Sequence, residues 1–461
     1  MRVYAAVVLL ISCTWLPHPA RAADVPVPCP DASPVQLFAD SACVITTLPL
    51  RHEAPDDASV DVFARRVPAP DAERRRGEVW LIAGGPGEPG VSLHPMLATF
   101  RAAFPDHDLV IPDHRGTGRS TRLCPAQESP GSADGVALAN SEWGPCIGEM
   151  YADAARTAAF TITQSAQDLS ALIARHRRAG DVHVYAVSYG TQLALRMLQI
   201  APQPLDGLVL DGLVPPESEA QWDLSHRTAL VDAVGREVLG PDASAAYASV
   251  LASAEPQAAW RAHVPGGDLR RTLGTLLNFP TLRDRLPTVV DALSRNDAAP
   301  LQAALDDLRE IQAVLTADPL APPSLPLVML ISSSENNSRP DLDRATVDGE
   351  ARDALFTSAI PGFLVDPPVP LYPRDRFFGR TPDRLPRTLV IHGTLDPNTS
   401  YAGAKAHVST LANAGPVQMA TVERGAHMLA FFAPTCFVAA TTAFLGDAEV
   451  AQSCREPETA Q

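Results

Sequence analysis

Lysine is almost absent from this chain of 461 residues, since Lys405 is its only lysine. The formal net charge is −16, and the one concentrated run of positive charge is the arginine triplet at residues 74–76. Proteins that bind nucleic acid neutralise phosphates with a basic patch or stripe. The composition offers no such surface, so we expect no nucleic-acid partner.

Aromatic residues are also scarce, at 6% of the chain, but 46% of the residues are hydrophobic. That content excludes a mainly disordered chain, and the length suffices for one large core with an inserted second domain. The sequence contains neither CxxC nor HExxH, and none of its cysteine spacings fits a zinc site. We therefore expect no metal and no organic cofactor.

No hydrophobic run is long enough for a transmembrane helix, which needs about 20 residues. The apolar stretch at residues 3–16 follows Arg2 and precedes Ala20-Arg21-Ala22, a small-x-small cleavage pattern. These features predict a signal peptide at residues 1–22 and a secreted or periplasmic protein, with no stable membrane insertion. As an alternative, Leu10-Ile11-Ser12-Cys13 resembles a bacterial lipobox, and a lipid on Cys13 would anchor the protein to a membrane.

If the protein is exported, the six cysteines after residue 22 can form disulfides. An even number of cysteines in an exported protein indicates disulfides, and pairing between nearest neighbours is the simplest arrangement. The predicted pairs are Cys29–Cys43, Cys124–Cys146 and Cys436–Cys454.

Ser188 lies between two contrasting patterns. Val182, Val184, Tyr185 and Val187 predict a buried strand, and from Leu193 onward the apolar residues recur at helical spacing. Ala186 and Gly190 flank the serine at two residues' distance. This arrangement is typical of the strand-turn-helix elbow that presents a nucleophilic serine, with alanine in place of its usual first glycine.

A second signal lies upstream, where an apolar strand at residues 79–82 leads into Ala83-Gly84-Gly85-Pro86-Gly87. A loop with so few side chains leaves its backbone amides free to face a ligand. Acyl transfer needs such donors, because negative charge develops on the attacked carbonyl oxygen. The amides of Gly85 and Tyr189 are our candidates for this oxyanion hole.

The remaining catalytic candidates follow two late strands. Asp396 comes after a strand at residues 388–391, and His427 comes after one at residues 417–422. A carboxylate that orients a histidine completes the chain order Ser, Asp, His of an α/β-hydrolase triad. An earlier histidine, His114, lies in the polar loop at residues 113–120, which we interpret as scaffold.

Several strings match one known family: AGGPGEPG, DHRGTGRS, VSYGT, LDGLVPPES, IHGTLDP and GAH. They span residues 79–213 and 388–454, and on them the chain resembles the α/β-hydrolase family of secreted proline iminopeptidases and tripeptidyl aminopeptidases. The resemblance implies an α/β fold with a mostly parallel central sheet flanked by helices. It also implies a serine peptidase mechanism that uses Ser188, Asp396 and His427.

Between the two matched regions the strand signals fade and apolar residues recur at helical intervals. We expect a hydrolase core at residues 23–214 and 387–461, with a mainly helical cap inserted at residues 215–386. Family members carry an acidic residue after an apolar run like that at residues 327–331, which here places Glu335. A carboxylate there would pair with the free α-ammonium of a peptide, although Glu335 also suits a solvated loop.

The expected activity is therefore release of one or a few residues from a peptide N-terminus through an acyl-enzyme. The alternative is a carboxylesterase for small esters, since the same triad cleaves both bonds. A non-catalytic binding protein on a hydrolase scaffold is a third class, which an intact triad disfavours.

Overall fold

The computed structural model describes residues 25–29, 38, 40–138, 140–253 and 258–457. The predicted signal peptide and the lipobox alternative at Cys13 lie outside these residues. None of the helices in the described ranges is both long enough and apolar enough to cross a bilayer.

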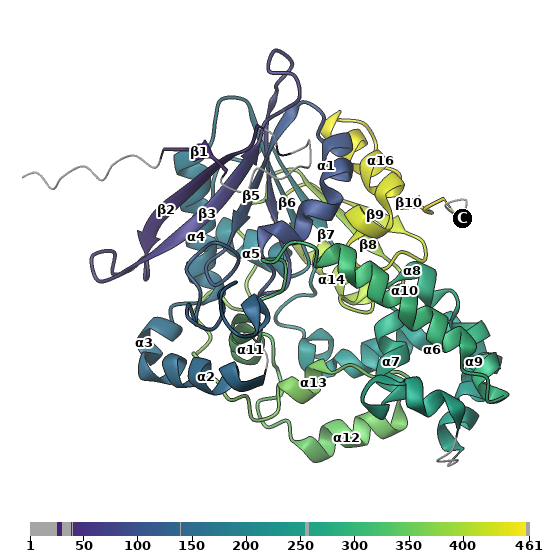
Figure 1. The fold of residues 1–461 in the computed structure, drawn as a ribbon. Helices are drawn as coiled ribbons and strands as arrows, with labels where there is room; N and C mark the ends of the chain where they lie inside the picture. Colours follow the sequence, from purple (N-terminus) through teal and green to yellow (C-terminus); the bar gives the residue numbers. More distant parts are fainter. Residues whose placement is uncertain (1–24, 30–37, 39, 139, 254–257, 458–461) are drawn as a thin grey trace, which may run out of the picture.

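A ten-stranded sheet in the order β1-β2-β3-β5-β4-β6-β7-β8-β9-β10 runs through the molecule (Figure 1). The strands β1, β2, β3 and β5 pair antiparallel, and the others pair parallel from β5 to β10. Every residue of β4, β5, β7 and β8 is buried, as expected for parallel strands covered on both faces. The strands are β1 Val27–Pro28, β2 Ala42–Pro49, β3 Ser59–Val67, β4 Gly77–Ile82, β5 His107–Asp113, β6 Asp181–Val187, β7 Gly207–Asp211, β8 Thr388–Gly393, β9 Val417–Val422 and β10 Ser453–Cys454.

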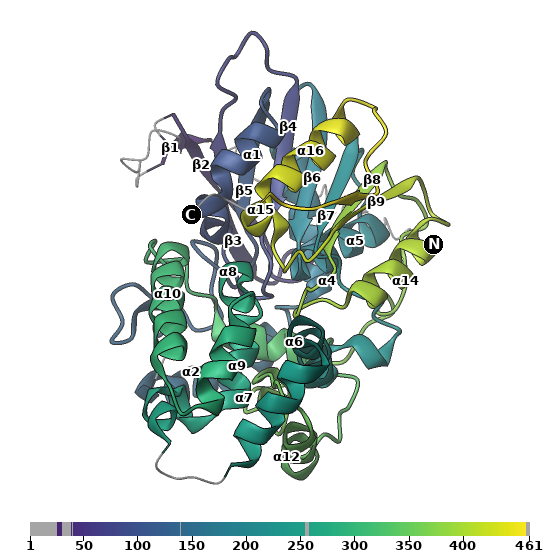
Figure 2. The same cartoon turned by 90° about the vertical axis from the view of Figure 1, so that its right-hand side faces the viewer.

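Two layers of helices cover this sheet, as Figure 2 shows from the side. One hydrophobic cluster joins one face to α1, α15 and α16, and a second joins the other face to α4, α5 and α14. The helices are α1 Leu97–Ala103, α4 Ile162–His176, α5 Tyr189–Ile200, α14 Tyr401–Leu411, α15 Leu429–Phe432 and α16 Pro434–Leu445. The predicted α/β-hydrolase architecture, a mostly parallel sheet flanked by helices, is confirmed.

The segment between β7 and β8 is helical and lies beyond one end of the sheet (Figures 1 and 2). Its helices are α6 Arg227–Ala252, α7 Leu269–Leu276, α8 Pro280–Arg283, α9 Leu286–Ser294, α10 Ala299–Leu315, α11 Leu325–Ser334, α12 Arg344–Asp353 and α13 Ile360–Phe363. Helices α6 to α10 share a hydrophobic cluster of their own. Leu327, Leu330 and Ile331 of α11 instead join the cluster of the sheet, so part of the inserted segment packs directly on the core. The division into core and cap at residues 214/215 and 386/387 stays a prediction.

Shorter elements complete the described chain. Helices α2 Trp143–Ala152 and α3 Ala154–Thr157 follow the loop after β5. The 3₁₀ helices are η2 Gly90–Met96, η3 Gly135–Ala137, η4 Asn140–Glu142, η5 Ala220–Trp222, η6 Leu224–His226, η7 Ala259–His263 and η8 Pro265–Gly267.

Three disulfides have the pairing predicted from the sequence. They join Cys29 to Cys43, Cys124 to Cys146 and Cys436 to Cys454, over separations of 14, 22 and 18 residues. A cross-link of this loop length contributes about 3 kcal/mol to the free energy of unfolding when it is unstrained. Such bonds persist in oxidising compartments, so they are consistent with an extracellular protein.

Candidate active site

Ser188 lies at a sharp turn between β6 and α5. Its φ is 56° and its ψ is −127°, a conformation that non-glycine residues rarely adopt. Gly190 permits the tight approach of this turn to β4, since a Cβ there would lie 2.6 Å from the carbonyl oxygen of Ala83. The structure therefore has the strand-turn-helix geometry predicted around Ser188, which projects a serine side chain away from the sheet.

The glycine loop after β4 lies directly against this turn. A Cβ on Gly84 would be 3.1 Å from Cβ of Ser188, and Gly85 has a φ of 105° that favours glycine. Tyr189 is the first residue of α5, so its amide has no acceptor inside that helix. Gly85 and Tyr189 line the same cavity as Ser188, and their role as an oxyanion hole stays a prediction.

His114 is hydrogen-bonded to the same glycine loop. Its Nε2 is 2.6 Å from the carbonyl oxygen of Pro86, and its ring lies 5.7 Å from that of Tyr189. Burial is the main cause that lowers the pKa of His114 to about 4, so the ring is neutral and donates to Pro86. The interpretation of His114 as scaffold agrees with these contacts.

Asp396 and His427 are hydrogen-bonded to each other, with 2.7 Å between Oδ2 and Nδ1. The Asp396 carboxylate also accepts from the amides of Asn398 and Thr399 at 2.7 and 2.9 Å and from the Thr399 hydroxyl at 2.6 Å. Burial alone would raise the pKa of Asp396, but the charge and hydrogen bond of His427 hold it well below its usual range. Asp396 is therefore ionised and able to orient the imidazole.

The pKa of His427 moves in the opposite direction. Burial opposes its charged form, yet the charge and hydrogen bond of Asp396 outweigh burial and raise the pKa above that of a free imidazole. Gly212, which follows β7, makes room for the ring, since a Cβ there would lie 2.8 Å from Cε1 of His427. With Nδ1 bound to Asp396, Nε2 is the nitrogen left for proton transfer.

Ser188 and His427 are both described, and the structure shows no hydrogen bond between them. Their segments are nevertheless tied together by Asp211, the last residue of β7. Its backbone carbonyl accepts from the amide of Ser188 at 3.0 Å, and its carboxylate accepts from the amides of Leu429 and Ala430 at 3.1 Å each. One buried residue thus fixes both the turn of Ser188 and the loop of His427.

A cavity of about 100 Å³ opens onto Ser188. Gly85, Tyr189 and Glu335 also line it, so four residues that were predicted separately meet in one space. Its other side belongs to the inserted segment and includes Trp222 and Arg227. The cavity therefore lies between the carboxyl ends of the strands and the inserted helices, where open α/β sheets bind their ligands.

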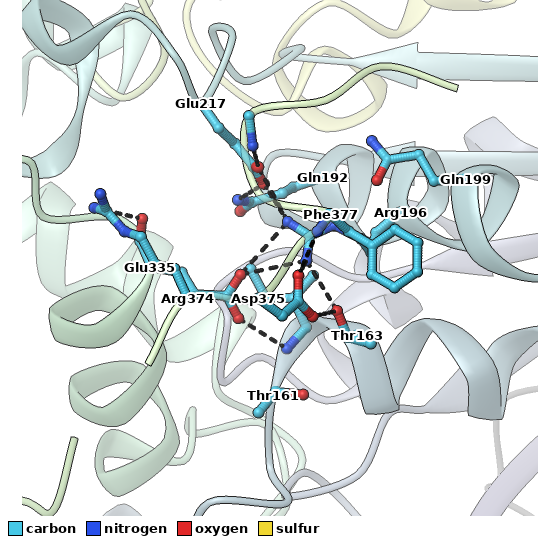
Figure 3. A network of polar contacts seen from close by, with 12 residues as sticks. Thr161, Thr163, Gln192, Arg196, Gln199, Glu217, Glu335, Arg374, Asp375 and Phe377 are labelled. Atoms are coloured by element: carbon cyan, nitrogen blue, oxygen red, sulfur yellow. Dashed lines mark hydrogen bonds and ion pairs between the residues drawn. The ribbon is translucent and has the colours of Figure 1, made fainter. Parts of the chain in front are cut away.

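Glu335 is buried rather than solvated, with 3% of its surface exposed. Its carboxylate accepts a hydrogen bond of 2.8 Å from the Tyr372 hydroxyl. It also lies 3.4 Å from Nη1 of Arg196 (Figure 3). Burial raises the pKa of Glu335 above its usual value, although the charge of Arg196 lowers it in part. The alternative of an exposed loop glutamate is wrong.

Arg196 of α5 is shared by three carboxylates (Figure 3). Its Nη2 lies 2.9 Å from Glu217, and its Nη1 lies 3.6 Å from Asp375 in addition to Glu335. Arg196 is 1% exposed, and burial would lower its pKa, but the three carboxylates together raise it. Glu217 and Glu335 both line the cavity of Ser188, and the guanidiniums of Arg227 and Arg374 line it as well.

Two family models match the chain. Residues 79–261 match the α/β-hydrolase fold, and residues 368–455 match a family described as TAP-like protein. The chain has the α/β-hydrolase fold. Both matched segments contain candidate catalytic residues, with Ser188 in the first and Asp396 and His427 in the second.

Solved structures similar to this hydrolase include a thermophilic esterase from Thermogutta terrifontis, with 14% identity and a TM-score of 0.40 over 87% of this chain and 98% of that one. A laboratory-evolved variant of potato epoxide hydrolase has 13% identity and the same TM-score, with 87% and 99% coverage. At this level of similarity they carry no argument about activity. No curated protein matches the hydrolase significantly.

The sequence analysis missed three residues of the site: Asp211, Glu217 and Arg196. Asp211 and Glu217 fall within the matched string LDGLVPPES, and for Asp211 the available signal was an acidic residue at a strand end. Arg196 had no such signal, because it is one polar residue on an amphipathic helix and its partner Glu335 lies 139 residues away. Only the packing of α11 against the core brings the two together.

Proposed function

We propose that this hydrolase is an exported serine aminopeptidase that cleaves peptide bonds near free N-termini through an acyl-enzyme. The observation that carries the proposal is the pair of buried or partly buried carboxylates, Glu217 and Glu335, in the cavity of Ser188. Glu217 and Glu335 face the same cavity and share one guanidinium, that of Arg196. The match of residues 368–455 to the TAP-like family also supports a peptidase.

The proposed chemistry follows the Ser-His-Asp scheme. Ser188 Oγ attacks the scissile carbonyl carbon while Nε2 of His427 takes the hydroxyl proton, and the amides of Gly85 and Tyr189 bind the oxyanion. His427 then protonates the departing amine. Water repeats the sequence on the acyl-enzyme and releases the free acid. The missing hydrogen bond between Ser188 and His427 is compatible with this scheme, because such bonds often tighten only when substrate binds.

The carboxylates of Glu217 and Glu335 provide a reason for amine recognition. An α-ammonium group is a compact cation with three donors, and a partly desolvated carboxylate binds it by a charge-assisted hydrogen bond. A neutral ester or an N-acetylated peptide leaves that carboxylate without this partner. These two carboxylates should therefore favour substrates with free N-termini over substrates with blocked N-termini.

Activity should fall as the pH decreases, with an apparent pKa above that of a free imidazole, about 6.5. The reason is that His427 acts as a base only when neutral, and Asp396 raises its pKa. Below that pKa, kcat/KM should drop about tenfold per pH unit. A pH–rate profile from 5 to 9 measures this, and a flat profile between pH 5 and 8 would contradict a histidine base.

Glu335→Gln should raise KM for free N-terminal peptides by about 10- to 100-fold, because it removes a buried charge that pairs with the substrate. KM for a neutral aryl ester should change less than about threefold. The matched control is Glu219→Gln, which removes an exposed glutamate two residues beyond Glu217. Equal effects of Glu335→Gln on both substrates would reject amine recognition.

The activity itself is tested with a matched set of substrates: free and N-acetylated proline and alanine anilides, a tripeptidyl anilide and a short-chain aryl ester. Cleavage restricted to the free-amine anilides would support an aminopeptidase, and the preferred length would separate single-residue from tripeptide release. Cleavage of the ester alone would make the protein a carboxylesterase.

A further inference from the structure

The opposite end of the sheet, at the amino ends of its strands, carries a cluster that the proposed hydrolysis does not use. It consists of His107 at the start of β5 and of Asp181 and His183 at the start of β6. One ligating atom from each of the three lies within 4.8 Å of the other two. Within the described ranges, this is the only group of histidine, cysteine and carboxylate side chains close enough to hold a metal ion.

The sheet register explains how residues from two non-adjacent strands meet. Gly77 of β4 pairs with His107 on one side and with Asp181 on the other. Because Gly77 has no side chain, nothing from β4 stands between the two neighbours. Only glycine fits there, since a Cβ would lie 2.1 Å from the carbonyl oxygen of Asp181.

Both histidines are buried without the hydrogen bonds that buried imidazoles usually make. His107 is 3% exposed and His183 is 4% exposed. Both ring nitrogens of His107 and Nδ1 of His183 have no hydrogen-bond partner. Each such atom costs about 1–3 kcal/mol relative to one that is satisfied. These ring nitrogens therefore have unused hydrogen-bonding capacity.

The two imidazole rings lie close together, with 5.2 Å between their centroids. Imidazole is the commonest metal ligand among protein side chains, and either ring nitrogen can bind the metal.

Asp181 contributes a negative charge to the cluster and makes it accessible to a metal ion from solvent. Its side chain is 38% exposed and forms an ion pair with Nη2 of Arg76 at 3.4 Å, while Arg76 itself is 58% exposed. An exposed pair of this kind is worth about 0–1 kcal/mol, so an incoming divalent cation displaces Arg76 at little cost.

We propose that His107, Asp181 and His183 form a zinc site that links the amino ends of β5 and β6. Two imidazoles and one carboxylate with a water suit tetrahedral Zn²⁺, whereas Ca²⁺ and Mg²⁺ require oxygen ligands. Ligand atoms around zinc lie about 3.4 Å apart. The three side chains reach that spacing by closing about 1.4 Å or less from the separations seen here.

The site lies far along β6 from Ser188, which follows the carboxyl end of the same strand. Zinc here acts on stability and takes no part in hydrolysis. The cross-link joins two strands that are separated by β4 and by more than seventy residues of chain, so it opposes opening of the sheet at this end.

The test is Zn²⁺ binding by the full chain after removal of metal with EDTA, measured by competition with a chromogenic chelator and by thermal unfolding. The wild-type chain should bind one more Zn²⁺ than His183→Phe. At a free Zn²⁺ concentration about 100 times Kd, its unfolding midpoint should rise by roughly 3 °C. Ca²⁺ and Mg²⁺ at the same concentration should cause no such rise.

Asp181→Asn extends the test to a variant that leaves the buried packing intact, and it should weaken Zn²⁺ binding at least tenfold. Asp106→Asn is the matched control, because Asp106 is a nearby acid outside the cluster, and it should bind Zn²⁺ as the wild type does. The proposal is overturned if the wild-type chain takes up no Zn²⁺. It is also overturned if His183→Phe or Asp181→Asn binds Zn²⁺ with unchanged stoichiometry and affinity.

Discussion

Ser188→Ala is expected to reduce kcat by about 10⁴- to 10⁶-fold on every substrate that the enzyme cleaves, while leaving the fold intact. The loss is large because the variant has no nucleophile, so the acyl-enzyme cannot form. Stability should change little, since serine and alanine pay a similar cost for the positive φ at this position. Steady-state kinetics with the anilide and ester set measures the effect, and circular dichroism checks the fold.

The matched control is Ser338→Ala, which removes another hydroxyl from the lining of the same cavity. Its kcat should stay within about threefold of the wild type, because Ser338 has no role in the proposed chemistry. If Ser188→Ala retained more than a hundredth of the wild-type kcat, the nucleophile would have to be sought elsewhere in the cavity.

Asp396→Asn should lower kcat by about 10⁴-fold with little change in KM. The amide keeps the shape of the side chain and can still accept from the amides of Asn398 and Thr399. It no longer holds His427 in the tautomer that leaves Nε2 free, nor does it stabilise the imidazolium. The raised pKa of His427 should fall as well, which moves the acid limb of the pH–rate profile to lower pH.

Non-additivity distinguishes this role from a loss of folding. If Asp396 acts only through His427 on Ser188, the double variant Ser188→Ala, Asp396→Asn should be no less active than Ser188→Ala alone. A further loss of activity together with a lower unfolding midpoint would show instead that Asp396 supports the structure around β8.

The parts of the site that could be predicted from the sequence are those whose structure depends on residues close together in the chain. Ser188 lies between a contiguous strand and a contiguous helix, and Asp396 and His427 lie in the loops that follow β8 and β9. The disulfides were predictable because each partner is the nearest cysteine. In these cases the neighbours along the chain supply most of the geometry.

The parts that could not be predicted depend on contacts between distant segments. The environment of Glu335 is set by Arg196 and Tyr372, which reach it only because α11 packs on the sheet cluster. His107 and His183 lie close together because β4 lies between β5 and β6 in the sheet. No periodicity or spacing in the sequence encodes that strand order.

The disulfides also bear on how the chain reaches its native state. Each joins a cysteine to the next one along the chain, with no bond crossing another. In a chain that enters an oxidising compartment from its N-terminus, the thiols of each native pair appear one after the other. If each cysteine pairs with the next one to appear, the native disulfides form directly and no isomerase is needed. A reduced, fully unfolded chain exposes the six thiols of these bonds at once, so that non-native pairs can also form.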